Sequence, residues 1–514
     1  MNTHKKPFAV VRTLLSIMLT STWMGSVACT NGESGGDDGI EAEYASPDER
    51  SHDTNSSSTI DSLEQDEWAG SHCARPRSLR NLVDDVFAGE PSVAGISVAL
   101  HKPGCGTFVH ARGQRDVARD KPMTPATKVH IASLTKPVTG ALVLFALERG
   151  LFGPLGLDTP IDAFLAEEQI ESLTSNCSDD FEIQAIDRET FEFAPALGIC
   201  PDFSAITLWH LVRAHDGNLS FEEIDTNRNG LGDALDYSLG AWFRAVGFPT
   251  LPPLASEPSN SFEVLDAVNI YRHNTAVIGG TTIDDFPISA GNTQYQLLGM
   301  ILEEVSARSY EALVKRHITD RLHTGQMILL TGIPSVRLER TEQISRGYAD
   351  VTGASSVLPE FDENTNGVYP VMQVRRRPVV DMYDFDSFTL ANGAGGAGAL
   401  VATTKSYVTF FRKLVTGGLL SPAMQTVFEQ GFSEIGVGPD VTYGFGVLRG
   451  ENNPDLGTIF VKNGALFGAV CLAAHITASQ VTVVVCANGR DIFESQVEGA
   501  LVPTLLLDLE TAAR

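Results

Sequence analysis

A serine and a lysine three residues apart are the side chains in this sequence best suited to covalent chemistry. Ser133 and Lys136 lie in the stretch IASLTK, which opens a mostly apolar segment that predicts a helix from Ser133 to Arg149. Residues three apart share one helix face, so the amine can accept or relay the serine proton. A helix N-terminus also favours the negative charge that develops during attack. The pattern indicates an acylating serine; the alternative is a helix N-cap followed by a solvated lysine.

The surrounding sequence predicts the elements that must position this pair. Runs rich in β-branched residues indicate strands near both ends of the chain, at 93–100, 107–112, 467–475 and 480–487. Helical patterns lie at 295–305, 404–414 and 492–509, the last interrupted by Pro503. We therefore expect one sheet assembled from the two ends of the chain. Weak periodicity predicts insertions or long loops near 170–205 and 220–285.

Composition and charge exclude some classes of function. The 514 residues are 43% hydrophobic and 20% charged, which is typical of a folded globular protein. The 37 basic and 64 acidic residues give a formal net charge of −27. Nucleic-acid binding depends on Lys and Arg contacts to phosphates, so we expect no nucleic-acid partner.

The N-terminal segment predicts export. Residues 1–28 combine basic residues, a short apolar run and terminal small residues, which is the pattern of a signal peptide. The sequence SVAC resembles a bacterial lipoprotein box and predicts lipidation of Cys29; the alternative is ordinary cleavage and a freely soluble secreted protein. Residues 29–72 hold 12 acidic side chains and one arginine, which predicts a disordered tether. The folded domain would span residues 73–514. The protein would be located in the bacterial cell envelope, either in the periplasm or at the cell surface.

The remaining cysteines predict disulfides. Six follow Cys29, an even number that fits an oxidising compartment. Cys471 and Cys486 lie symmetrically about the turn between the last two predicted strands, so we expect a cross-strand bond between them. Nearest-neighbour pairing predicts the other bonds as Cys177–Cys200 and Cys73–Cys105.

The serine–lysine pair lies within a longer pattern of motifs. It is embedded in ATKVHIASLTKPVTGALVLFALERG and followed by LGLDTPIDAFL. Farther along are GNTQYQLLGMILEEVSARSYEALVKRHI, GAGALVATTKSYVTFFRKLVTGGLLSP, YGFGV and the tripeptide Lys462-Asn463-Gly464. From about residue 85 to 505, apart from the insertions, this pattern resembles the superfamily of serine β-lactamases, D-alanyl-D-alanine carboxypeptidases and esterases, particularly its class C-like branch.

The resemblance implies a fold and a set of roles. The fold would be of the α/β (α+β) class with three layers: an antiparallel sheet, terminal helices on one side, and a helical subdomain holding Ser133 on the other. Ser133 would be the nucleophile and Lys136 its base, with an oxyanion hole formed by the backbone N–H groups of Ser133 and Ala465. The residues implied to bind substrate or the oxyanion are Asn292, Lys462, Gly464 and Ala465.

The implied substrate is a small molecule or a peptidoglycan-type peptide. Lys462 would hold a substrate carboxylate; a solvated strand lysine is the alternative. The membrane would be contacted through the lipid anchor only, and catalysis would need no cofactor.

One position departs from the family's Tyr-x-Asn element. When Asn292 is aligned with its asparagine, Ala290 falls at the tyrosine. Loss of that phenol removes a proton-transfer group commonly worth about 10²–10⁴-fold in rate. Two hypotheses remain. In the first, the protein is a serine hydrolase acting on an ester, peptide or β-lactam, with Lys136 as the only base or with a phenol such as Tyr271 or Tyr383 supplied from elsewhere. In the second, it is a degenerate, non-catalytic binding or scaffold lipoprotein.

The segment 225–236 could hold a calcium ion. Its sequence DTNRNGLGDALD places oxygen-bearing side chains at positions 1, 3, 5, 9 and 12, with a glycine at position 6. It resembles the calcium loops of EF-hand and dockerin-like modules, and its role would be structural; the alternative is a polar turn. The expected ligands are Asp225, Asn227, Asn229, Leu231 (through its carbonyl), Asp233 and Asp236.

Overall fold

The computed structural model describes the larger part of the folded domain. The described residues are 68–166, 181–186, 193–199, 204, 206–213, 224–225, 277–278, 292–324, 327–329, 343–350, 371–381, 395–434, 440–454, 456–466, 468–491, 497 and 501–514.

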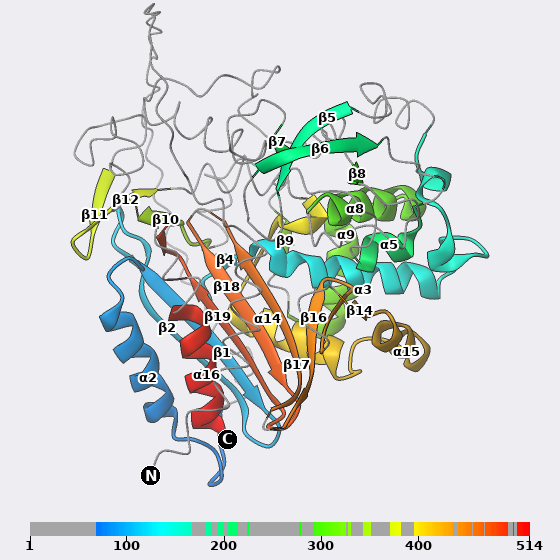
Figure 1. Ribbon diagram of the computed structural model, residues 1–514. Helices are drawn as coiled ribbons and strands as arrows, with labels where there is room; N and C mark the ends of the chain where they lie inside the picture. The colour runs from blue at the N-terminus through cyan, green and yellow to red at the C-terminus, as the bar shows by residue number, and fades with distance from the viewer. Residues whose placement is uncertain are drawn as a thin grey trace, which may run out of the picture.

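A nine-stranded sheet forms the centre of the molecule (Figure 1). Neighbouring strands in it are antiparallel. In spatial order the strands are β14 (Ser433–Glu434), β15 (Val441–Gly444), β16 (Val447–Asn453), β17 (Gly457–Ala465), β18 (Val470–Ile476), β19 (Val481–Ala487), β1 (Gly95–Lys102), β2 (Gly106–Asp116) and β3 (Lys121–Pro122). The N-terminal β1 pairs with the C-terminal β19, so the predicted assembly of the sheet from both chain ends is confirmed.

Helices cover both faces of this sheet, which gives the predicted three layers. The terminal helices α2 (Pro76–Gly89) and α16 (Val502–Ala513) pack together on one face (Figure 1). Helix α14 (Thr404–Val415) packs against β1 and β19 on the other face. Its Thr403 side chain accepts the Ser406 N–H, which fixes the start of the helix. Of the predicted helix over 492–509, the structure describes α16 from Val502 onward, with Pro503 in its first turn; residues 492–496 and 498–500 lie outside the described residues.

The helical subdomain lies beside the sheet, on the side of β16 and β17 (Figure 1). Its longest members are α3 (Thr135–Glu148) and α8 (Thr293–Ser306), which pack on each other. Nearly all of α3 is buried, as its apolar sequence predicts. The shorter helices are α5 (Leu208–Arg213), α9 (Tyr310–Val314), a π-helical turn (Lys315–Thr319), α10 (Asp320–Leu322) and α15 (Pro422–Gln430), with 3₁₀ turns at Ala132–Leu134, Gly156–Asp158, Ile161–Phe164 and Gly395–Ala397.

Three smaller sheets complete the described elements. The one next to the nucleophile segment is β4 (Val129–His130), β13 (Leu400–Ala402) and β9 (Met327–Leu329). A second contains β11 (Val371–Val374), β12 (Arg377–Asp381), β10 (Tyr348–Asp350) and β20 (Arg490–Asp491). In the predicted insertions, β7 (Ile224–Asp225), β5 (Phe181–Ile186), β6 (Phe193–Ile199) and β8 (Val277–Ile278) form a third.

Two of the three predicted disulfides are confirmed. Cys471 and Cys486 face each other across the hairpin of β18 and β19 and are bonded. Cys73 is bonded to Cys105. The third predicted pair, Cys177 with Cys200, lies outside the described residues.

Among the described helices, none has both the length and the apolar character needed to cross a bilayer.

Candidate active site

Ser133 lies on a sharp turn between β4 and α3. Ala132 has a φ of 47°, a left-handed conformation that residues with a side chain rarely adopt. The sequence predicts a helix from Ser133, whereas the α-helix begins at Thr135 and Ser133 occupies the 3₁₀ turn before it. This turn leaves the Ser133 side chain partly exposed at the start of a buried helix.

Lys136 connects the serine to Asn292. Its side chain is almost fully buried, with 2% of the residue exposed. Lys136 Nζ donates to Ser133 Oγ at 3.3 Å and to Asn292 Oδ1 at 2.7 Å. Asn292 is the residue before the first turn of α8, so the packing of α8 on α3 brings it to the lysine. Three residues that the sequence predicts for the site therefore meet in one hydrogen-bonded group.

Strand β17 lies directly against the nucleophile turn. A Cβ atom added to Gly464 would lie 2.4 Å from the Ile131 carbonyl oxygen and 2.8 Å from the Ser133 backbone nitrogen. Only glycine permits this approach, because real Cβ atoms essentially never come within 3.0 Å of such neighbours. Ala465, the predicted second oxyanion residue, follows Gly464 at the end of the same strand. Strand β17 and the turn at position 133 are therefore in close backbone contact at Gly464.

Lys462 lies deeper than its predicted role requires. Only 3% of the residue is exposed, and its Nζ lies 5.8 Å from the centre of the Tyr443 ring. Burial, and next the charge of Lys136, lower the pKa of Lys462 well below the ordinary lysine value. Burial therefore disfavours the ammonium, which is the form that holding a substrate carboxylate requires.

Two buried tyrosines form the wall behind the lysines. The rings of Tyr295 and Tyr443 meet edge to face with centroids 6.5 Å apart. Lys136 Nζ lies 6.0 Å from the Tyr295 centroid, and the Tyr295 hydroxyl donates to the Val212 carbonyl at 3.2 Å. Burial raises the pKa of both phenols, so they remain protonated and neutral.

Close backbone approaches that the sequence does not reveal fix the base of the site. A Cβ on Gly446 would lie 2.4 Å from the Lys136 carbonyl carbon, and one on Gly140 would lie 2.3 Å from the Phe445 carbonyl oxygen. The Tyr407 hydroxyl of α14 donates to the Leu134 carbonyl at 2.7 Å. The glycines in YGFGV were a sequence signal for a tight turn, but only packing identifies α3 as its partner.

Several predicted positions lie outside the described residues. These are Cys29, Ala290, Tyr271, Tyr383 and the calcium-loop residues Asn227, Asn229, Leu231, Asp233 and Asp236. Asp225 ends the short strand β7, and its side chain is likewise outside the description.

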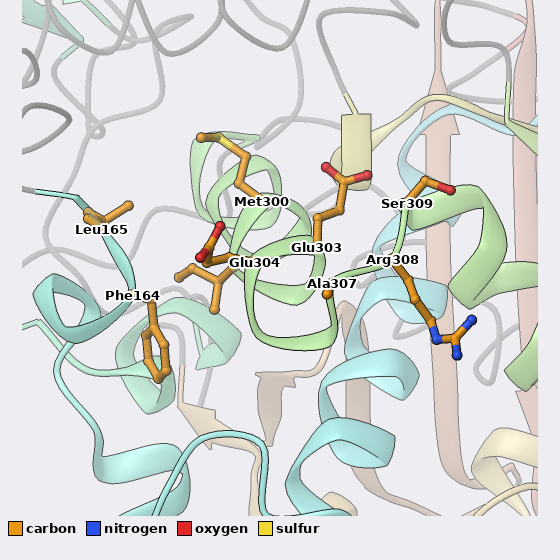
Figure 2. Close-up of a pocket in the computed structure, with 9 residues that line it drawn as sticks. Phe164, Leu165, Met300, Glu303, Glu304, Ala307, Arg308 and Ser309 are labelled. Atoms are coloured by element: carbon orange, nitrogen blue, oxygen red, sulfur yellow. The ribbon is translucent and has the colours of Figure 1, made fainter.

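A separate cavity of about 390 Å³ lies along the C-terminal half of α8 (Figure 2). Figure 2 shows Phe164 and Leu165 on one side of it and Met300 and Glu304 of α8 on the other. Asn292, at the opposite end of α8, contacts Lys136. The cavity is therefore distinct from the serine–lysine site.

Comparison with known proteins identifies the family. The family model described as Beta-lactamase matches residues 79–175 and 291–502, more than half of the chain. The chain belongs to the Beta-lactamase family. The two matched ranges contain Ser133, Lys136, Asn292 and Lys462, and they exclude most of the predicted insertions.

Solved structures of similar fold include a D-amino acid amidase and penicillin-binding proteins. D-amino acid amidase from Ochrobactrum anthropi SV3 has a TM-score of 0.56 at 18% identity, covering 84% of this chain and 98% of that one. The octameric penicillin-binding protein homologue from Pyrococcus abyssi has a TM-score of 0.56 at 19% identity, covering 84% and 77%. The penicillin-binding protein from Bacillus halodurans has a TM-score of 0.55 at 15% identity, covering 84% and 99%. No curated protein sequence matches the chain significantly.

Proposed function

We propose that this protein is a serine hydrolase that works through an acyl-enzyme on Ser133. The observation that carries the proposal is the hydrogen-bonded group of Ser133 Oγ, Lys136 Nζ and Asn292 Oδ1 against the edge of β17. A buried amine within reach of a partly exposed hydroxyl is the arrangement that an activated nucleophile requires. Membership of the Beta-lactamase family supports the same chemistry.

The proposed reaction has two steps. Ser133 Oγ attacks the substrate carbonyl while its proton passes to a lysine amine, and the backbone N–H groups of Ser133 and Ala465 stabilise the oxyanion. The leaving group departs with that proton, and water then hydrolyses the acyl-enzyme. Asn292 holds Lys136 by accepting from its amine.

We propose an ester, an amide, a peptidoglycan-type peptide or a β-lactam as substrate. The D-amino acid amidase and penicillin-binding proteins of similar fold support amides and peptides. A panel of p-nitrophenyl esters, D-amino acid amides, D-alanyl-D-alanine peptides and a chromogenic β-lactam would rank these classes by kcat/KM.

Covalent labelling tests the proposal. The purified protein is incubated with a fluorescent fluorophosphonate and with a fluorescent penicillin, beside the Ser133→Ala variant. Labelling of the wild type, lost in Ser133→Ala and mapped to Ser133 by mass spectrometry, is expected. A wild type that takes no label and hydrolyses no member of the panel would instead support the non-catalytic binding protein, the alternative that Ala290 favours.

The proposed location is the bacterial cell envelope, with a lipid on Cys29. The two described disulfides indicate an oxidising compartment. Metabolic labelling with an alkyne fatty acid is expected to mark the wild type and not Cys29→Ser. Label retained by Cys29→Ser, or absent from both proteins, would contradict lipidation.

We also propose that the loop 225–236 binds calcium with a structural role. Millimolar calcium is expected to raise the melting temperature of the wild type but not that of the double variant Asp233→Asn, Asp236→Asn. Equal melting curves with calcium and with EDTA would contradict the site.

A further inference from the structure

A second cavity, of about 160 Å³, lies between the C-terminal halves of α3 and α8. Its walls are mostly apolar: Leu142 and Phe145 come from α3, Leu302 from α8 and Leu313 from α9. An apolar protein cavity of about 150 Å³ admits benzene, so this one has room for an apolar group of that size. Cavities of this kind bind small molecules when a few polar groups fix the orientation of the ligand.

The polar side chains at this cavity are Arg149, Arg308, His317 and Ser306. Among the described residues that line it, none is acidic. Both arginines are exposed, and neither forms an ion pair with a carboxylate in the part of the chain that the structure describes. Arg308 also borders the larger cavity of Figure 2, where its guanidinium points away from Glu304. Two guanidinium groups are therefore available to an anionic ligand.

A buried histidine holds one of these guanidinium groups in place. Arg149 Nη1 lies 3.1 Å from His317 Nε2, and because a guanidinium only donates, the histidine nitrogen accepts. Only 5% of His317 is exposed, and its ring stacks on Phe145 with centroids 5.1 Å apart. Burial, and next the charge of Arg149, lower the pKa of His317 to about 4, so the neutral ring accepts this hydrogen bond at neutral pH.

The charges near this histidine are positive although the chain as a whole is acidic. Arg149, Arg316, Arg321 and Arg308 all act on His317, and each lowers its pKa. The formal net charge of the chain is −27, so this group of arginines has the opposite sign to the molecule around it. Such a local field attracts anions, and an anion that leaves water for an apolar cavity needs a cation as its partner.

We propose that this cavity binds a small carboxylate that carries an apolar group about the size of a benzene ring. The carboxylate lies on Arg149 and Arg308, and the ring lies between α3 and α8. Arginine binds a carboxylate through two parallel hydrogen bonds, which fixes the orientation of the ligand as well as its charge. Contact of the ring with Leu142 and Leu302 removes apolar surface from water.

The site is separate from the serine–lysine group. On α3, Phe145 lies nine residues beyond Lys136, which is about 13 Å along a helix. On α8, Leu302 lies ten residues beyond Asn292, which is about 15 Å. A ligand the size of benzoate is shorter than either distance, so the inference does not depend on the chemistry proposed for Ser133.

The test is a titration of the purified protein with para-fluorobenzoate, followed by fluorine NMR of the ligand at neutral pH and constant ionic strength. Saturable binding, displaced by benzoate, is expected. Benzamide has the ring without the charge, and acetate has the charge without the ring; each should displace the probe at least about tenfold less effectively than benzoate. Absence of binding would overturn the inference, and so would either competitor matching benzoate.

Substitutions locate the bound probe. Arg149→Gln and Arg308→Gln each remove a cation at an exposed position, and each should weaken binding by about tenfold or more without altering the fold. Val305→Phe fills the cavity from α8 and leaves both arginines, so it should abolish binding. The matched control is Arg80→Gln on α2, which lies across the sheet from α3 (Figure 1) and should bind the probe like the wild type.

The active site is the competing location for the probe. Prior labelling of Ser133 with a fluorophosphonate should leave binding unchanged. Binding that is lost after labelling but unchanged in both arginine variants would put the probe at Ser133 and overturn the inference. If the protein takes no label, the proposed hydrolase fails, whereas this site is still decided by the arginine variants: wild-type affinity in both would overturn it.

Discussion

The approach of β17 to the nucleophile turn gives the sharpest prediction, because Gly464 cannot carry a side chain without moving that turn. In Gly464→Ala, the new methyl group would lie 2.4 Å from the Ile131 oxygen and 2.8 Å from the Ser133 nitrogen. Ordinary van der Waals contact begins at 3.4 Å, so β17 and the turn must separate by about 1 Å. Both contacted atoms are backbone atoms, and neither can rotate away.

The cost should fall on reactivity more than on folding. Misplacement of reacting groups by about 1 Å costs about 10²-fold in rate, whereas overpacking a core costs about 1–3 kcal/mol. We expect the second-order rate of fluorophosphonate labelling to drop about 10²-fold. Denaturant unfolding should show a loss of stability within the overpacking range, so that the variant remains folded.

The matched control for this prediction is Gly89→Ala. Gly89 ends α2, and a Cβ there would meet nothing within 4 Å. Alanine in a helix is favoured over glycine by about 0.5–1 kcal/mol, so this variant should label at the wild-type rate with equal or higher stability. If Gly464→Ala also labelled at the wild-type rate while folded, the approach of β17 to Ser133 would not be the feature that holds the site.

Three further predictions concern the charge and covalent constraints of the fold. Burial lowers the pKa of His130 to about 4, so between pH 6.5 and 4 the unfolded state binds a proton that the native state does not. As the pH falls through this range, His130 should lower the free energy of unfolding by up to about 1.4 kcal/mol per pH unit. Equilibrium unfolding should show this slope, and His130→Gln should reduce it. Replacing both Cys471 and Cys486 by serine removes a bond across 15 residues and should lower the free energy of unfolding by roughly 3 kcal/mol, which urea titration without reductant measures; no loss would show that the hairpin needs no crosslink. Asn292→Asp puts a carboxylate against Lys136, which stabilises the ammonium and raises the pKa of Lys136. The pH at which fluorophosphonate labelling of Ser133 falls to half on the acid side should therefore move up. An unchanged midpoint would show that Asn292 does not influence the base.

The sequence alone determined the elements that depend on local pattern. Alternating β-branched runs placed β1, β2, β18 and β19, because strand periodicity is a property of neighbouring residues. The symmetric spacing of Cys471 and Cys486 about a turn predicted their bond, since register in a hairpin follows from the turn. The spacing of Ser133 and Lys136 predicted their contact, because residues three apart share one face of a helical turn. One helix boundary was less accurate: Ser133 lies in a 3₁₀ turn, and the α-helix begins at Thr135.

Only the tertiary structure decided how those pieces form a site. Asn292 is 156 residues from Lys136 along the chain, and its contact depends on α8 packing against α3. The left-handed Ala132 and the fit of Gly464 against Ser133 are visible only when the strand and the turn are in contact. The family resemblance predicts Lys462 as a cation for a substrate carboxylate, yet burial and the charge of Lys136 lower its pKa well below the ordinary lysine value. Residue type and spacing are written in the chain, whereas burial and charge environment depend on which distant segments exclude water from each side chain.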